Sequence, residues 1–188
     1  MQDISFYFSL GLKHVMDWNA YDHVLFLIAL VAVYTFSSWK KVFYLVSSFT
    51  IGHTASLIVS YYEIVSFNSH VIECLIPISI GVMCIGNFFI SKKPKGGFYL
   101  LVTLFFGVIH GFGFASYYKM IAPDNQILSL IGFALGVEVS QLIIVIITLF
   151  IAFVLQQFFS VKKRDWILVI SALVLGRVIP MILDSCIL

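Results

Sequence analysis

The sequence predicts an all-α membrane protein, a bundle of six transmembrane helices with a short N-terminal interfacial helix. Three observations lead to this prediction. The chain of 188 residues is 61% hydrophobic and 11% charged, and its mean hydropathy of +1.06 is far outside the range of soluble domains. The apolar residues fall into six runs, each close to or above the about 20 residues that cross a bilayer. Basic clusters separate alternate runs. Residues 1–188 are therefore expected to form a single integral membrane domain.

The predicted elements follow in chain order. The first, from Ile4 to Met16, is too short to span a bilayer and is predicted to lie at the interface. Six spans come after it, and the fifth is long enough to tilt or to extend past the bilayer. The predicted spans are Ala20–Ser37, Val42–Tyr62, His70–Ile90, Phe98–Tyr118, Ile127–Phe158 and Trp166–Ile187.

The charge of the connecting loops predicts the orientation of the bundle. Three basic loops alternate with connections that hold a single lysine and no arginine. Because basic loops remain in the cytoplasm, both termini are predicted to face outward, with a bacterial inner membrane as the expected location. A net charge of +2 gives no indication of a nucleic-acid partner. The basic loop residues are Lys40 and Lys41; Lys92, Lys93 and Lys95; and Lys162, Lys163 and Arg164.

Ionisable residues lie inside or at the edges of these apolar runs. A lone charge in hydrocarbon costs several kcal/mol, so such residues are usually paired and functional. Imidazole and carboxylate groups are common ligands of nickel, cobalt, zinc and iron, and a transition-metal site is therefore predicted. All candidates are expected in the outer half of the membrane or near its middle, with Asp22 and His23 within one turn of an outer end. The candidate ligands are His14, Asp22, His23, His53, Glu73, His110 and Glu138.

Each candidate also has a structural interpretation. Asp22 can cap the start of a helix, or it can orient a metal-binding histidine without binding the metal itself. His53 lies among small and hydroxyl residues that favour hydrogen bonds between helices. His110 is flanked by glycines, which allow either close packing or a distorted helix that lines a site. Glu138 has Arg177 as its expected counter-charge, because the next span places that residue at a similar depth.

Glu73 and the cysteines leave further alternatives open. Pro77 frees the carbonyl about one turn earlier, so Glu73 is either part of a cation-binding corner or an interfacial helix start. The three cysteines are interpreted as packing residues in preference to metal ligands or a disulfide, because they form no CxxC pair and two lie in an apolar span. They are Cys74, Cys84 and Cys186.

The candidate residues occur in an ordered series of motifs from about Gly11 to Val145. The motifs are Gly11-Leu-Lys-His14 with Asp22-His23-Val-Leu-Phe-Leu, Phe49-Thr-Ile-Gly-His53-Thr-Ala-Ser-Leu, Ile72-Glu73-Cys-Leu-Ile-Pro-Ile-Ser79-Ile with Gly86-Asn87, Phe106-Gly-Val-Ile-His110-Gly-Phe-Gly-Phe-Ala, and Phe133-Ala-Leu-Gly-Val-Glu138-Val-Ser-Gln141-Leu. With this series the chain resembles the HupE/UreJ family, in particular its HupE/UreJ_2-like branch.

The resemblance implies a nickel or cobalt permease of the kind tied to hydrogenase and urease maturation. In that family a histidine followed by Asp-His in the first span is the metal motif, which matches His14, Asp22 and His23. The gap between His14 and Asp22 is longer than in the nickel-type pattern, so the metal is left open among nickel, cobalt and zinc.

Three functions follow as hypotheses. The leading one is transport of a divalent transition-metal ion through a His/carboxylate site in the outer half of the bundle. The alternative is a zinc-dependent intramembrane hydrolase, in which histidines hold zinc with one position open for water and Glu73 or Glu138 is the general base. A third is a structural or sensor protein with buried ion pairs and no metal. The expected partners are the lipid bilayer and a metal ion, and a homo-oligomer is left open.

Overall fold

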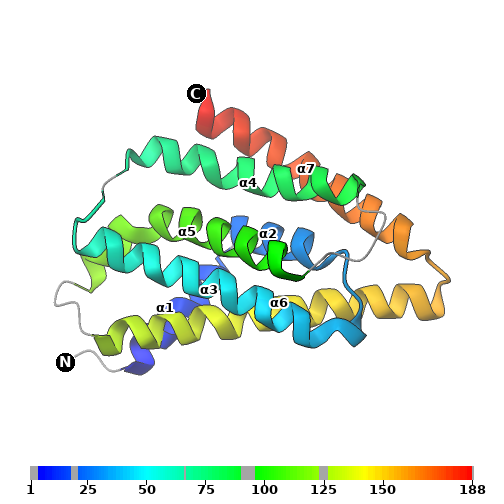
Figure 1. The fold of residues 1–188 in the computed structure, drawn as a ribbon, viewed down its shortest axis with the longest axis horizontal. Coiled ribbons are helices and arrows are strands. Elements are labelled where there is room, and N and C mark those ends of the chain that lie inside the picture. Colours follow the sequence, from blue (N-terminus) through cyan, green and yellow to red (C-terminus); the bar gives the residue numbers. More distant parts are fainter. Residues whose placement is uncertain (1–3, 18–20, 66, 90–95, 123–126, 188) are drawn as a thin grey trace.

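The computed structural model describes residues 4–17, 21–65, 67–89, 96–122 and 127–187 of the chain. Within these residues every regular element is a helix, which confirms the predicted all-α class (Figure 1). The predicted count of six spans and the interfacial position of the first helix are not confirmed. The elements are α1 (Ile4–Val15), α2 (Asp22–Val31), the 3₁₀ turn η1 (Phe36–Ser38), α3 (Trp39–Tyr61), α4 (Ser69–Phe89), α5 (Gly96–Ile121), α6 (Ile127–Phe158) and α7 (Lys163–Cys186).

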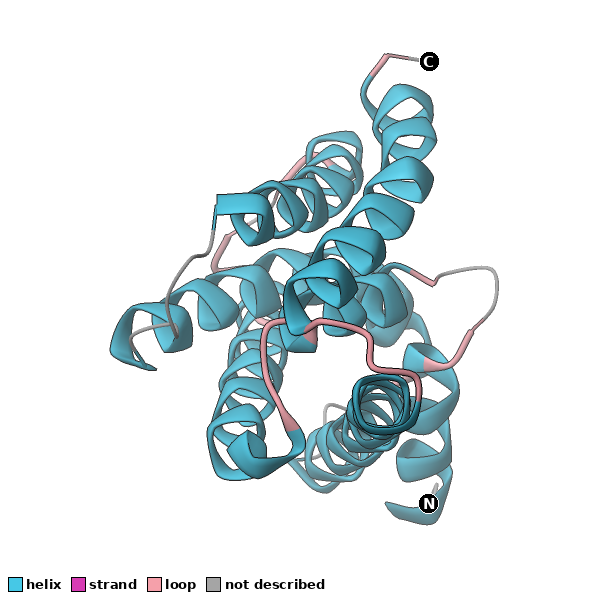
Figure 2. Ribbon diagram, turned by 90° about the vertical axis from the view of Figure 1, so that its right-hand side faces the viewer, coloured by secondary structure: helices cyan, strands magenta, loops and turns pink. Residues whose placement is uncertain are grey.

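Five of the described helices, α3 to α7, are long and apolar enough to cross a membrane. They lie side by side along the long axis of the molecule (Figures 1 and 2), and among these five the most extensive packing joins α3 to α5 and α4 to α7. Large apolar side chains such as Leu101, Ile146 and Leu173 are exposed on the outside of the bundle. An apolar exterior around a packed interior is what lipid requires, so the chain is an integral membrane protein.

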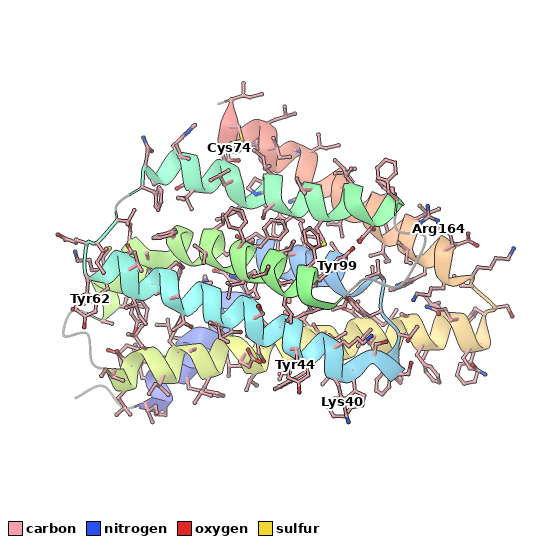
Figure 3. The ribbon with its side chains drawn as sticks, in the orientation of Figure 1. Lys40, Tyr44, Tyr62, Cys74, Tyr99 and Arg164 are labelled. Atoms are coloured by element: carbon pink, nitrogen blue, oxygen red, sulfur yellow. A yellow bond between two sulfur atoms is a disulfide. The ribbon has the colours of Figure 1, made fainter. Side chains whose placement is uncertain are left out.

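The two ends of the bundle differ in charge. Lys40 and Lys41 lie at the start of α3, and Lys162 to Arg164 lie at the start of α7. The Arg164 guanidinium donates hydrogen bonds to the carbonyls of Asn87 and Phe88 in the last turn of α4, so these termini share one end, here called the basic end. Lys40 and Arg164 are seen at this end in Figure 3, with Tyr62 at the opposite end. The connection with Lys92, Lys93 and Lys95 lies outside the described residues.

The predicted first span is not confirmed as a continuous helix. Its described helical part, α2, has 10 residues and is only about 15 Å long. It ends at the basic end, where the Asn87 side-chain amide donates a hydrogen bond of 2.8 Å to the carbonyl of Ala29. It begins in the middle of the bundle, because His23 in its first turn lies against His53 and His110, near the middles of α3 and α5.

Helix α1 occupies the other half of this path. It begins at the opposite end and packs along α6, where a Cβ added to Gly136 would collide with the carbonyl oxygen of Phe8 and one added to Gly11 with that of Phe133. Such backbone contact needs glycine. The structure therefore packs α1 along α6 with part of its surface exposed. Helices α1 and α2 meet at His14 and His23 in the middle of the bundle, and together they are called the broken span below; residues 18–20 between them lie outside the described residues.

The interpretation of the cysteines as packing residues is wrong for two of the three. Cys74 in the second turn of α4 and Cys186 at the end of α7 form a disulfide, and Cys84 is buried and free. The pair is 112 residues apart in sequence but adjacent in space because α4 and α7 are antiparallel neighbours. The disulfide lies away from the basic end, near the end where α7 finishes; Cys74 is labelled in Figure 3.

Candidate metal centre

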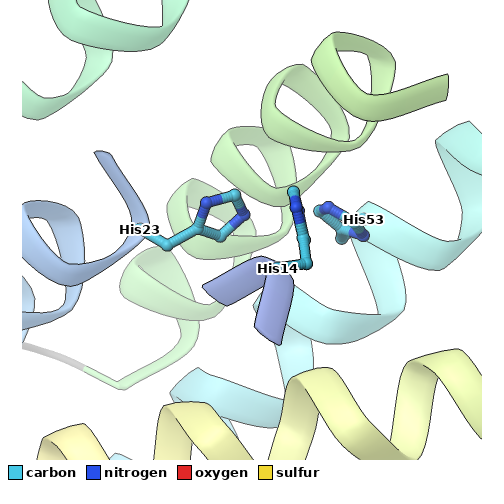
Figure 4. A group of neighbouring side chains, drawn as sticks. All are labelled: His14, His23 and His53. Atoms are coloured by element: carbon cyan, nitrogen blue, oxygen red, sulfur yellow. The ribbon is translucent and has the colours of Figure 1, made fainter. Parts of the chain in front are cut away.

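Three histidine side chains from three different elements meet in the middle of the bundle (Figure 4). His14 comes from the last turn of α1, His23 from the first turn of α2 and His53 from the middle of α3. Each offers a ring nitrogen that lies within 4.8 Å of those of the other two. Nitrogens bound to one tetrahedral zinc ion are about 3.3 Å apart, given Zn–N distances of about 2.0–2.1 Å. Small side-chain rotations are therefore sufficient for the three to share a cation.

A fourth histidine completes the cluster. The ring of His110, from α5, lies with its centroid 5.1 Å from that of His23. Its Nδ1 lies 2.8 Å from the carbonyl oxygen of Phe106, so Nδ1 carries the hydrogen and Nε2 is left with its lone pair available. These four residues, His14, His23, His53 and His110, are called the histidine cluster below.

Asp22 orients one member of the cluster. Its Oδ1 accepts a hydrogen bond of 2.8 Å from the backbone N–H of His23 and lies 3.0 Å from Nδ1 of the same ring. A carboxylate that accepts the Nδ1–H of a histidine leaves Nε2 as the metal-binding atom. The sequence left open whether Asp22 is a ligand, an orienting group or a helix cap, and this geometry favours the orienting role.

Five buried ring nitrogens of the cluster have no hydrogen-bond partner. They are His14 Nε2, His23 Nε2, His53 Nδ1 and Nε2, and His110 Nε2. Leaving a buried polar atom unpaired costs about 1–3 kcal/mol. Because His53 is 0% exposed and His110 is 1% exposed, water does not relieve this cost from outside the bundle. Several unpaired imidazole nitrogens facing one another fit the donor set of a borderline transition-metal ion.

Close backbone contact between α3 and α5 brings His53 and His110 together. A Cβ added to Gly107 would collide with the carbonyl oxygen of Phe49, and one added to Gly111 with the carbonyl oxygen of His53. Helix α5 is continuous through both glycines. Of the two roles predicted for these residues, the structure thus supports close packing.

Aromatic side chains enclose the cluster. The ring centroid of Phe114 lies 3.8 Å from that of His14, and Phe49 lies 5.2 Å from His110. Phe26 and Phe133 are 0% exposed and contact the same histidines. The surroundings are apolar, which strengthens any interaction between a cation and the cluster.

The two predicted glutamate ligands lie outside the cluster. Glu138 on α6 accepts hydrogen bonds from the hydroxyls of Ser47, at 2.6 Å, and Thr50. Glu73 on α4 is exposed and lines an open cavity whose inner wall includes Asp22. Sequence reasoning missed Asp184, which lines the same cavity and was not among the candidate ligands. No local pattern marks it, because the cavity depends on how α7 packs against α4.

Two further expectations are corrected by the structure. The predicted pair of Glu138 and Arg177 does not form: the guanidinium of Arg177 lies 4.8 Å from the ring centroid of Tyr21. Helix α7 packs against α4 and α2, so it does not pack along α6, the span that precedes it in sequence. The expected depth of Asp22 and His23, within a turn of an outer end, is also wrong, because α2 begins in the middle of the bundle.

Comparison with known proteins identifies a family. The family model described as HupE / UreJ protein matches residues 1–183. No curated protein and no solved structure matches the chain.

Proposed function

Because the chain belongs to the HupE / UreJ family, we propose that it binds a divalent transition-metal ion at the histidine cluster and carries it across the membrane. The family is associated with nickel and cobalt transport. The observation that carries the proposal is the convergence of His14, His23 and His53, whose ring nitrogens lie within 4.8 Å of one another inside an apolar bundle.

The ligands of the transported ion are the neutral imidazoles of the histidine cluster. His14, His23 and His53 supply three nitrogens, and His110 supplies a fourth as the ion moves between positions in the cluster. The Asp22 carboxylate holds the His23 ring and offsets part of the charge of the ion. Nickel, cobalt and zinc all accept such a set, and the choice among them rests with geometry and supply more than with ligand type.

The broken span gives this proposal a mechanism for movement. Irregular backbone at membrane depth is tolerated only where it lines a site or a cavity, and broken helices are common in transporters. His14 and His23 stand on the two sides of the break, so a tilt of either half-helix changes the separation of two ligands. On the basic side, α2 is packed with Phe26, Leu27 and Leu30, all buried, and release toward that side therefore requires α2 to move.

Two independent features support an orientation with the basic end in the cytoplasm. Basic loops are retained in the cytoplasm, and the disulfide between Cys74 and Cys186 lies toward the opposite end. Disulfides persist in oxidising compartments such as the bacterial periplasm. We therefore propose a bacterial inner-membrane location with both ends of the chain on the periplasmic side.

Elemental analysis of the purified protein tests the proposal. About one nickel, cobalt or zinc ion per chain is expected after equilibration with that metal, and His53→Ala removes it. His70→Ala is the matched control, because His70 is exposed at the start of α4, away from the cluster. Uptake of the same metal into vesicles that contain the protein, lost in His53→Ala, is the expected functional result. Metal content unchanged in His53→Ala contradicts the site.

A second function is favoured by one specific observation. A groove of about 520 Å³ on the outside of the bundle, between α3 and α6, is lined by apolar residues together with Glu138, Ser47, Thr50 and Thr54. A lipid-facing groove that contains a carboxylate suits an intramembrane metal-dependent hydrolase in which Glu138 is the general base. Vesicles that bind metal but take up none, together with turnover of a lipid ester or amide, would favour this alternative.

A further inference from the structure

An open cavity of about 330 Å³ lies between the ends of α4 and α7 that are joined by the disulfide. Three carboxylates line it: Glu73 from α4, Asp184 from α7 and Asp22 from the start of α2. None of the lining residues that the structure describes is basic. Glu73 and Asp184 are exposed, so the cavity is open to the outside of the bundle.

Asp22 joins this cavity to the histidine cluster. Its side chain is 16% exposed, while the His23 side chain to which it is hydrogen-bonded is 3% exposed. The carboxylate thus lies between an open acidic cavity and imidazoles whose unpaired nitrogens are buried. Elsewhere the described walls of the cluster include the aromatic rings of Phe26, Phe49 and Phe133, all 0% exposed, which no hydrated cation crosses readily.

We propose that this cavity is the entrance through which divalent cations reach the histidine cluster, and that Glu73 and Asp184 determine its selectivity for cations. The inference rests on the proposed metal-binding function and adds the route and the residues that attract the ion. It also assigns a role to the disulfide and to the carboxylates of Glu73 and Asp184, which lie outside the cluster.

The charges of the cavity have the sign and position that the route requires. A cleft lined by one sign of charge and bounded by low-dielectric walls raises the local concentration and the association rate of an opposite charge by about 10- to 1,000-fold. Arg177 is a cation beside the cavity, because its guanidinium lies 4.8 Å from the ring centroid of the lining residue Tyr21. Three carboxylates outweigh this one guanidinium. In addition, Pro77 has no N–H to donate, which frees the carbonyl oxygen of Glu73 from one helical hydrogen bond.

The disulfide fixes the mouth of the cavity. Cys74 follows Glu73 in α4, and Cys186 follows the lining residue Ser185 in α7. A covalent link directly beside the lining residues holds the two helices, and therefore the two outer carboxylates, at a constant separation. The entrance keeps its width when other parts of the bundle move.

Stopped-flow measurement of Zn²⁺ binding to the full chain in detergent tests the entrance. The variants are the neutral pair Glu73→Gln with Asp184→Asn, and the charge reversal Glu73→Lys. The control is Glu63→Gln, an exposed acid also away from the basic end that is paired with Lys119. The hydrogen bond and charge of Lys119 lower the pKa of the Glu63 carboxyl, so the control also removes a carboxylate charge.

The neutral pair is expected to slow Zn²⁺ association about ten-fold at about 0.01 M salt, where the Debye length is about 30 Å, and Glu73→Lys more strongly. The difference should largely disappear at about 1 M salt, where the Debye length is about 3 Å. The dissociation rate and the number of ions bound stay unchanged, and Glu63→Gln behaves as the natural chain.

The other outcomes overturn the inference in distinguishable ways. Association that is as fast in the neutral pair as in the natural chain excludes the cavity as the entrance. Faster dissociation or a lost ion shows that Glu73 or Asp184 is itself a ligand, which also contradicts the proposal. A natural chain that binds no more Zn²⁺ than His53→Ala refutes the metal centre itself, and the inference with it.

Discussion

The Oδ1 atom of Asp22 lies 3.0 Å from Nδ1 of the neighbouring residue, His23, and also accepts the backbone N–H of His23. Residues adjacent in a helix point about 100° apart, so a direct contact between their side chains needs the carboxylate to fold back over the helix start. Both groups are thereby fixed. Asp22 holds the ring, and the ring presents Nε2 to the histidine cluster.

The first prediction concerns this pair. Asp22→Asn keeps the shape of the side chain but removes its charge, so it holds the His23 ring less firmly and leaves more positive charge in the centre. The affinity for Zn²⁺ should fall about 10- to 100-fold, as is typical when a carboxylate behind a metal-binding histidine is altered. Competition with a chelator of known affinity measures the change. Asp165→Asn, in the first turn of α7 at the basic end, should leave the affinity unaltered, and an equal loss in both variants would contradict the assigned role.

A second prediction tests the contact between α3 and α5. The Cβ of Gly107→Ala collides with the carbonyl oxygen of Phe49, which is backbone and cannot rotate away. The two helices must separate, which should lower the free energy of unfolding by about 1–3 kcal/mol and weaken metal binding, because His53 and His110 move apart. Thermal unfolding in detergent, followed with and without Zn²⁺, measures both effects.

Matched glycines supply the control for that experiment. Gly86 in α4 and Gly176 in α7 are helical, and a Cβ added to either meets nothing within 4 Å. Alanine there should be neutral or stabilise the protein by about 0.5–1 kcal/mol, because glycine is less favourable than alanine inside a helix. If Gly107→Ala behaved like these two variants, the close approach of α3 and α5 would be refuted.

The sequence predicts the long helices well because a helix that crosses a bilayer needs about 20 apolar residues, and a run of that length is evident in the hydropathy of the sequence. The predicted span Ile127–Phe158 coincides with α6, and Phe98–Tyr118 lies within α5. Hydropathy cannot detect the broken span. Residues 24–34 are as apolar as those of a continuous helix, and only packing against α4, α6 and α7 decides that α2 starts at Asp22 in the middle of the bundle.

The histidine cluster could be predicted in part for a similar reason. An imidazole in an apolar run is conspicuous, and all four members of the cluster were candidates. Hydropathy gives the depth of a residue but not the side of the bundle that it faces. Glu138 and Arg177 have similar depths and were paired, yet α6 and α7 are separated in space. Cys74 and Cys186 were left unpaired because nothing in their local sequence indicates that α4 and α7 are antiparallel neighbours.

A third prediction counts thiols. If Cys74 and Cys186 are joined and Cys84 is free, the protein denatured without reductant should react with one equivalent of maleimide, and with three after reduction. Cys84→Ser should give none before reduction and two after it. Three equivalents without reductant, in protein protected from reducing agents throughout purification, would contradict the disulfide and remove its support for the orientation.

The last prediction tests whether α2 is anchored at the basic end as the second half of a broken span. Asn87 is 1% exposed, and its side-chain amide donates to the carbonyl of Ala29 and, at 3.1 Å, to the hydroxyl of Ser171. It therefore ties α2 to α4 and α7 at one point. Asn87→Ala removes both hydrogen bonds and leaves the Ala29 carbonyl and the Ser171 hydroxyl without this partner, which should cost about 1–3 kcal/mol in the free energy of unfolding.

Ser171→Ala separates the two bonds, because it removes only the one to α7. It should cost less than Asn87→Ala, about 0.5–1.5 kcal/mol, and hydrogen exchange at the amides of α2 should rise in Asn87→Ala alone. A half-helix held at its far end moves less at its start, so Asn87→Ala should also loosen His23 and speed Zn²⁺ dissociation, whereas Ser171→Ala should not. Equal exchange and equal dissociation in the two variants would mean that α2 is held by its apolar packing, and that the Asn87 contact with Ala29 does not position the metal centre.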